Sequence, residues 1–68
     1  MVTIYGKDTC PYTNAAIEDH ERRKVAFDYK NVKKDPVAMK EMLAWSDGQR
    51  LVPVIVRDGR VEIGFGGT

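Results

Sequence analysis

The sequence contains one cysteine and one histidine among its 68 residues, and both shortages limit its chemistry. A single cysteine excludes an internal disulfide, whereas secreted domains of this size normally carry several cysteines. No secretion signal is recognisable, and no apolar run approaches the roughly 20 residues that a membrane-spanning helix needs. We therefore expect a protein of the reducing cytoplasm that does not bind a membrane.

An excess of charge of either sign is also missing. The chain has 11 basic and 10 acidic residues, a net charge of +1, distributed along its length. Such a balance gives no long-range field, so we expect no nucleic acid partner. The sequence shows no repeat and no low-complexity segment, and its glycines and prolines fall in expected turns. We therefore expect one small domain over residues 1–68, with a thin core.

The lone cysteine lies where a predicted strand gives way to a predicted helix. Residues 1–5 are rich in β-branched and aromatic side chains, and Pro11 suits the first position of a helix. Cys10 then stands at the N-cap, where unpaired amides and the helix dipole favour an anion. Lys7 adds positive charge and the Thr13 hydroxyl can donate to the sulfur, so we expect a lowered thiol pKa. The alternative is a small packed cysteine without a chemical role.

The first predicted helix covers residues 11–24. Its charged residues, acidic before basic, suit the helix dipole and a solvated face. His20 follows Cys10 by ten residues, about 15 Å along a helix, which is too far for His20 to act as a base for the thiol. We expect His20 on the surface, without a metal-binding or pH-sensing role. The predicted apolar stripe of this helix consists of Tyr12, Ala15, Ala16 and Ile17.

The middle of the chain predicts a second strand and a second helix. Residues 26–32 alternate apolar and polar side chains, which is typical of a strand with one buried face. Asp35 and Pro36 suit the start of a helix and Gly48 suits its end. A strand, a helix and a strand in succession predict parallel pairing with a right-handed crossover. The expected core positions of the second helix are Val37, Met39, Met42, Leu43 and Trp45.

The last third of the chain predicts a hairpin. Its strands are residues 51–56 and 61–63, joined by the turn Asp58-Gly59. Pro53 cannot donate to a ladder, so it belongs at a bend or at the first residue of an edge strand. A bend would leave the backbone groups of Val52 free for a ligand's backbone.

Three separated segments resemble glutaredoxins. Lys7-Asp8-Thr9-Cys10-Pro11-Tyr12-Thr13 is similar to the active-site motif of that family, with Thr13 where its second cysteine stands. Gly48-Gln49-Arg50-Leu51-Val52-Pro53 resembles the segment that leads to the family's cis-proline, and Gly64-Phe65-Gly66-Gly67 resembles its double-glycine turn. The chain is most similar to the small UXX-star group, in which selenocysteine often occupies the position of Cys10.

The resemblance implies an α/β thioredoxin-like fold of the glutaredoxin type. Its elements would follow in the order β-α-β-α-β-β around a mixed four-stranded sheet, without the third C-terminal helix of other glutaredoxins. It also implies that Pro53 is cis and faces Cys10.

The resemblance further implies a glutathione site and no metal site. Cys10 would be the nucleophile, and Lys7 and Thr13 would complete the catalytic set. Glutathione, the co-substrate, is an anionic peptide, so a basic side chain, a free strand edge and a glycine turn suit it. Its contacts would be Lys7 and Tyr12 beside the tripeptide, Arg50 and Gln49 at the glycine carboxylate, Val52 next to Pro53 at the cysteine backbone, and Gly66 and Gly67 at the γ-glutamyl end.

Two departures from the family pattern change these expectations. Because Thr13 replaces a cysteine, no intramolecular disulfide can form, and only a one-cysteine cycle with free glutathione remains. Glutaredoxins usually follow the double glycine with an acidic residue and a third helix that holds the γ-glutamyl carboxylate, whereas Thr68 is the last residue here. We therefore expect weak glutathione affinity.

The resulting hypothesis is a monomeric, cytoplasmic, glutathione-dependent thiol-disulfide oxidoreductase that reduces glutathionylated or disulfide substrates through Cys10. One alternative is an iron–sulfur module, in which Cys10 from two chains and two glutathiones hold a [2Fe–2S] cluster. Another is a peroxide-reducing or redox-sensing protein in which Cys10 becomes a sulfenic acid. A redox-silent adaptor with an ordinary thiol is the fourth.

Overall fold

The structure is a computed structural model that describes residues 1–65. The predicted order of strands and helices is confirmed: β1 (Val2–Gly6), α1 (Pro11–Arg22), β2 (Phe27–Asn31), α2 (Pro36–Trp45), β3 (Val54–Arg57) and β4 (Arg60–Ile63). The strands form one mixed sheet in the order β2-β1-β3-β4. As predicted, β1 and β2 are parallel, whereas β3 runs antiparallel to both β1 and β4.

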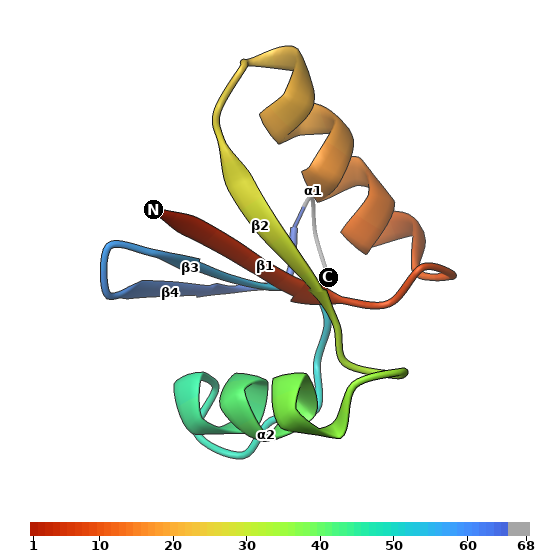
Figure 1. Cartoon of the computed structure of the whole chain (residues 1–68), viewed down its shortest axis with the longest axis vertical. Coiled ribbons are helices and arrows are strands. Elements are labelled where there is room, and N and C mark those ends of the chain that lie inside the picture. Colours follow the sequence, from red (N-terminus) through yellow and green to blue (C-terminus); the bar gives the residue numbers. More distant parts are fainter. Residues whose placement is uncertain (66–68) are drawn as a thin grey trace.

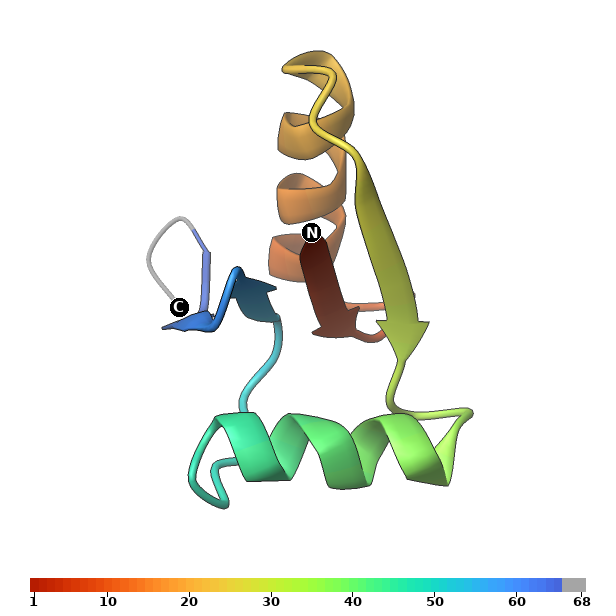
Figure 2. The same ribbon diagram turned by 60° about the vertical axis from the view of Figure 1, so that its left-hand side comes forward.

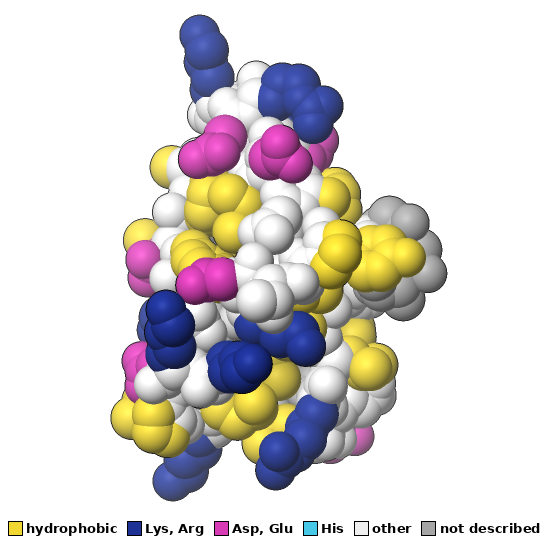
Figure 3. Space-filling view, turned by 90° about the vertical axis from the view of Figure 1, so that its right-hand side faces the viewer, with side chains coloured by type: hydrophobic (Ala, Val, Ile, Leu, Met, Phe, Trp, Pro, Cys, Tyr) yellow, Lys and Arg dark blue, Asp and Glu magenta, His cyan; other side chains and the backbone are white. Residues whose placement is uncertain are grey.

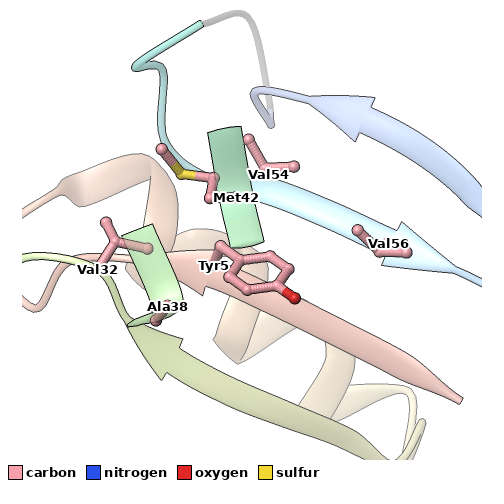
Figure 4. Packing of buried hydrophobic residues seen from close by; sticks show 6 residues of the cluster. All are labelled: Tyr5, Val32, Ala38, Met42, Val54 and Val56. Carbon is pink, nitrogen blue, oxygen red and sulfur yellow. The ribbon is translucent and has the colours of Figure 1, made fainter. Parts of the chain in front are cut away.

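The two helices cover opposite faces of the sheet (Figure 1; Figure 2). Alternate residues of β1 serve the two faces, because successive side chains of a strand point to opposite sides. Val2 and Ile4 pack with Ala16 of α1, and Tyr5 packs with Met42 of α2. Figure 4 shows the second cluster, in which side chains of α2 lie against those of β1 and β3. The core is therefore two thin layers on one sheet.

The inner face of α2 differs from the prediction at its two ends. Ala38 and Met42, one turn apart, are 1% and 0% exposed, and Met39 and Leu43 are partly buried against the same cluster. The predicted core residues Val37 and Trp45 are 64% and 42% exposed, so that part of the prediction is wrong. Each residue of a helix turns by about 100°, which carries Val37 away from the face that Ala38 sets toward the sheet.

The predicted surface position of His20 is also wrong. Its side chain is 0% exposed, because α1 turns Thr13, Ala16 and His20 toward the sheet. Nδ1 lies 2.7 Å from the Ala16 carbonyl oxygen, and Nε2 lies 3.2 Å from an Arg57 guanidinium nitrogen. This geometry fits the neutral ring, with Nδ1 donating and Nε2 accepting.

Local turn chemistry sets most element boundaries. Helix α1 ends before Lys24, which has a φ of 57°, and α2 begins with the Asp35 carboxylate accepting from the Val37 amide at 3.0 Å. The predicted hairpin turn is confirmed, since Asp58 and Gly59 have φ values of 49° and 83°, the left-handed region that a type I′ turn requires. Within residues 1–65, no helix is long and apolar enough to cross a membrane.

Candidate active site

Four segments of the chain meet at one edge of the sheet. In the strand register, Gly6 at the end of β1 is paired with Asn31 at the end of β2, and Tyr5 is paired with Val54 at the start of β3. Val54 in turn pairs with Ile63 at the end of β4. The Cys10 loop, the β2–α2 connection, the bend at Pro53 and the segment after β4 therefore leave the sheet at the same edge.

Cys10 occupies the predicted N-cap of α1. Its backbone is extended, with φ −88° and ψ 118°, and Pro11 begins the helix. The Cys10 amide donates to the Lys7 carbonyl oxygen at 3.2 Å, and the Cys10 carbonyl oxygen accepts from the Asn14 amide at 3.1 Å. The residue is thus held between a tight turn and the first turn of the helix, and it remains 8% exposed.

The environment of the sulfur favours the thiolate. Burial raises the pKa of the Cys10 thiol, but the Thr13 amide, the Thr13 hydroxyl, the Tyr12 amide and the charge of Lys7 lower it, and the net pKa lies below the ordinary value of 9.0. The cysteine makes no side-chain capping hydrogen bond in the structure. The amides of the first turn are therefore uncapped donors, and an anion at the sulfur is the group that they stabilise.

Thr13 lies beneath the cysteine and is 0% exposed. Its Oγ1 has no hydrogen-bond partner among residues 1–65. The side chain fills the space left by Gly6, because a Cβ on Gly6 would lie 2.4 Å from Thr13 Cγ2 and 2.6 Å from Oγ1. A buried hydroxyl without a hydrogen-bond partner destabilises the fold. A thiolate at Cys10 would give this hydroxyl an acceptor, so the placement of Thr13 favours the ionised sulfur.

The turn before the cysteine is held through Asp8. The Tyr29 hydroxyl of β2 donates to Asp8 Oδ1 at 2.8 Å, and Lys34 Nζ lies 3.5 Å from Oδ2. The Asn14 side-chain amide donates to the Asp8 carbonyl oxygen at 3.0 Å. Sequence analysis missed Gly6 and Tyr29, because each acts through a residue distant in the chain and neither carries a motif of its own.

The bend before β3 agrees with the prediction for Pro53. The Val52–Pro53 peptide bond is cis, and the Pro53 carbonyl oxygen accepts from the Gly64 amide at 2.7 Å. Val52 is half-buried, and within residues 1–65 its backbone makes no hydrogen bond to another residue. The sequence prediction that the backbone of Val52 is free to pair with a ligand is therefore compatible with the structure.

The remaining predicted ligand contacts lie on exposed parts of the same edge or outside the residues that the structure describes. Gln49 and Arg50 are exposed on the connection from α2 to β3, and Tyr12 is 44% exposed on the first turn of α1. Gly66 and Gly67 lie outside the described residues. The structure thus brings Lys7, Tyr12 and Thr13 close to Cys10. Gln49 and Arg50 lie on a separate segment, the connection from α2 to β3.

The edge carries several basic side chains. Lys33, Lys34 and Arg50 are exposed on its loops, and Lys7 is partly exposed. Figure 3, which faces the side of the β1–α1 and β2–α2 loops, shows Lys and Arg side chains across its middle and lower part, beside exposed hydrophobic side chains. In the described part of the chain there is no enclosed cavity and no cluster of three potential metal ligands. Cys10 itself is buried, so a substrate must reach a mostly covered sulfur from the surface that these side chains form.

The fold and this cysteine define a class of protein. The sheet is mixed and has helices on both faces, and a thiol of lowered pKa at the start of the first helix lies at the same edge of the sheet as a cis-proline. These features make this a thioredoxin-fold redox protein. The Glutaredoxin family model matches residues 2–62. The chain belongs to the glutaredoxin family.

Solved structures support this assignment. The thioredoxin-like protein BC3987 is 31% identical, with a TM-score of 0.88 over 96% of this chain and 88% of that one. NrdH-redoxin from Escherichia coli, a glutaredoxin-like protein described as having a thioredoxin-like activity profile, is 30% identical, with a TM-score of 0.82 over 94% and 82% of the two chains. Glutaredoxin (grx-1) from Archaeoglobus fulgidus is 28% identical, with a TM-score of 0.80 over 94% and 74%. A comparison with curated proteins found no match.

Proposed function

We propose that this protein is a one-cysteine thiol-disulfide oxidoreductase that reduces glutathionylated thiols with glutathione. The observation that carries the proposal is the position of Cys10 at the N-cap of α1, on an edge of the sheet whose loops expose Lys33, Lys34 and Arg50. The lowered pKa of the thiol agrees with this position. A thiolate is the nucleophile in disulfide exchange, and a basic surface suits the anionic tripeptide.

The proposed cycle has two exchange steps. The Cys10 thiolate attacks the glutathione sulfur of a mixed disulfide, forms the Cys10–glutathione disulfide and releases the substrate as a thiolate. A free glutathione thiolate then attacks the glutathione sulfur of that disulfide, which forms oxidised glutathione and returns the Cys10 thiolate. Thr13 cannot provide a second sulfur, so the external thiol is required.

The proposed glutathione contacts follow the same edge. Lys7, Tyr12, Arg50 and Gln49 offer polar or aromatic side chains, and the unpaired backbone of Val52 beside Pro53 offers a strand edge. Gly66 and Gly67 complete the proposed set. We propose that glutathione binds weakly and is held mainly in the covalent intermediate.

The test compares wild type with Cys10→Ser and Thr9→Val in reduction of a glutathionylated peptide by glutathione. Thr9 is an exposed residue of the same loop, so its variant serves as a control that keeps the thiol. We expect the Thr9→Val rate to match wild type, the Cys10→Ser rate to fall to background, and mass spectrometry to find one glutathione on Cys10. Equal rates for wild type and Cys10→Ser would refute the proposal.

A second candidate function is the reduction of protein disulfides. The similarity to NrdH-redoxin, with its thioredoxin-like activity profile, favours it, as do the exposed Tyr12 and Leu51 at the edge. Without a second cysteine, the mixed disulfide with the protein substrate would have to be resolved by another thiol. Reduction of a protein disulfide that proceeds equally well with glutathione or a non-peptide thiol would favour this candidate over the first.

The iron–sulfur and peroxide alternatives remain testable on the same sample. Visible absorbance after anaerobic reconstitution with iron, sulfide and glutathione would indicate a cluster, and Cys10-dependent consumption of peroxide would indicate a sulfenic acid intermediate.

We propose that the protein is a monomer. We also propose that it acts in the cytoplasm, because a lone reactive thiol requires a reducing compartment.

A further inference from the structure

Asp8 is held at both its side chain and its backbone, two residues before the proposed nucleophile. The Tyr29 hydroxyl and Lys34 contact its carboxylate, at 2.8 Å and 3.5 Å. The Asn14 side chain contacts its carbonyl oxygen at 3.0 Å. The loop between β1 and α1 is therefore tied to β2, to the β2–α2 connection and to α1.

These contacts bear on the position of the sulfur. Cys10 ends the turn that its amide closes onto the Lys7 carbonyl oxygen, so a rotation of this turn moves the cysteine relative to the first turn of α1. Tyr29 is a firm anchor for the turn, because it lies on β2 at the register position of Ile4 and packs against the cluster between the sheet and α1.

The same contacts bear on the charge of the sulfur. Asp8 carries a negative charge two residues before a group that must itself become an anion, and like charges oppose each other. The Tyr29 hydroxyl stabilises the Asp8 carboxylate through a hydrogen bond, and the ammonium of Lys34 offsets its charge. Burial, the hydrogen bond to Asp8 and the charges of Asp8 and Cys10 raise the pKa of Tyr29, so the ring senses the ionised sulfur. The charge of Lys7 lowers the pKa of the thiol.

We propose that Tyr29 is a positioning residue for Cys10, which acts by holding the Asp8 carboxylate and thereby fixing the turn from Lys7 to Cys10. The proposal rests on the proposed function only in requiring a reactive thiolate. Tyr29 touches neither substrate nor sulfur in this role. Its hydrogen bond holds in place the carboxylate of the residue that comes two positions before the nucleophile.

The test is the pH dependence of Cys10 alkylation by iodoacetamide in wild type and Tyr29→Phe. We expect alkylation of Tyr29→Phe at pH 7 to be about threefold slower, with its pH profile displaced to higher pH, because the Asp8 charge is less well satisfied. Tyr5→Phe is the matched control. It removes a hydroxyl that donates to a carboxylate, Glu41 Oε1 at 3.2 Å, on the opposite face of the sheet. Its alkylation profile should coincide with that of wild type.

A double-mutant cycle identifies the route of the effect. In an Asp8→Ala background, Tyr29→Phe should change the alkylation profile no further. An undiminished effect in that background, or a Tyr29→Phe profile that coincides with wild type, would overturn the proposal. Urea midpoints for each variant identify loss of folding. Because alkylation needs no glutathione, a failure of the deglutathionylation assay with a displaced Tyr29→Phe profile would refute the proposed function and leave this inference standing.

Discussion

Replacing Thr13 by valine should make the protein more stable and its thiol less reactive. The substitution keeps the β-branched shape and the helix propensity of the residue, and it exchanges one buried hydroxyl for a methyl group. In the structure this hydroxyl is fully buried against Gly6 and has no partner within residues 1–65. Its contribution therefore depends on whether the neighbouring sulfur is neutral or charged.

When the Cys10 thiol is protonated, the buried Thr13 hydroxyl destabilises the fold. A buried polar group without a partner costs about 1–3 kcal/mol, so at a pH below the folded-state pKa of Cys10 the Thr13→Val substitution should stabilise the fold by roughly 1 kcal/mol after imperfect packing is allowed for. For a domain of this size, 1 kcal/mol corresponds to about 4–8 °C in Tm. Thermal or urea unfolding of the reduced protein measures this difference.

When the Cys10 thiol is ionised, the Thr13 hydroxyl stabilises the thiolate. Thr13 is among the groups that hold the pKa of Cys10 below its ordinary value, and a hydrogen bond to a charged group contributes about 1.5–3 kcal/mol. Since about 1.4 kcal/mol is a tenfold change in an equilibrium constant, Thr13→Val should slow alkylation of Cys10 near neutral pH by on the order of tenfold. The stability advantage of the variant should shrink or reverse at pH 9.

Two further variants serve as controls. Thr9→Val makes the same change at an exposed position of the same loop and should alter neither stability nor alkylation. Thr13→Ser keeps the hydroxyl and loses one buried methyl, so it should retain reactivity and lose about 1 kcal/mol of stability. If Cys10 of Thr13→Val is alkylated at the wild-type rate, Thr13 does not stabilise the thiolate. Destabilisation by Thr13→Val at a pH below the folded-state pKa of Cys10 would show that the hydroxyl has a partner when the thiol is protonated.

The other predictions concern the supports of the site. Gly6→Ala should cost about 1–3 kcal/mol in urea unfolding, because its Cβ would overlap Thr13, and Thr13→Ala should recover part of that loss in the double variant. Because the folded pKa of Cys10 is depressed, its contribution to stability is fully present above the ordinary value of 9.0 and is lost as pH falls through the folded-state pKa. The free energy of unfolding of wild type minus Cys10→Ser should therefore rise with pH across that interval, and a flat difference would contradict the lowered pKa. His20→Leu should lower the free energy of unfolding by about 1–3 kcal/mol in urea, because it leaves the guanidinium of Arg57 without its partner; no loss would mean that the guanidinium finds water.

Local signals in the sequence predicted the frame of the molecule. Pro11 after Cys10, Asp35 before Pro36, and the turn Asp58-Gly59 each act within a few residues, and the structure confirms the boundaries that they mark. The parallel pairing of β1 with β2 follows from the strand-helix-strand order. These features require no knowledge of which helix face meets the sheet.

The sequence predictions were wrong where tertiary contacts decide which face of a helix is buried. On α1 the buried residues are Thr13, Ala16 and His20. Ala16 belonged to the predicted apolar stripe, whereas hydropathy alone does not mark Thr13 and His20 as buried. His20 is buried because the Ala16 carbonyl oxygen and Arg57 of β3 satisfy its two nitrogens, and Arg57 lies 37 residues away. Tyr29 was expected in a strand, but its hydrogen bond to Asp8 spans 21 residues. No pattern within a single helix or strand contains such information.

The lowered pKa of Cys10 affects both halves of the proposed cycle. A thiol of lower pKa is a weaker nucleophile per thiolate, but more of it is ionised near neutral pH, and it is a better leaving group. Cys10 must attack once and leave once, since Thr13 offers no second sulfur to displace the bound glutathione. The same donors at the start of α1 therefore promote the attack by populating the thiolate and promote the release by stabilising it again. A one-cysteine site thus depends more on these donors than a two-cysteine site does, because in the proposed cycle an external thiol must complete every turnover.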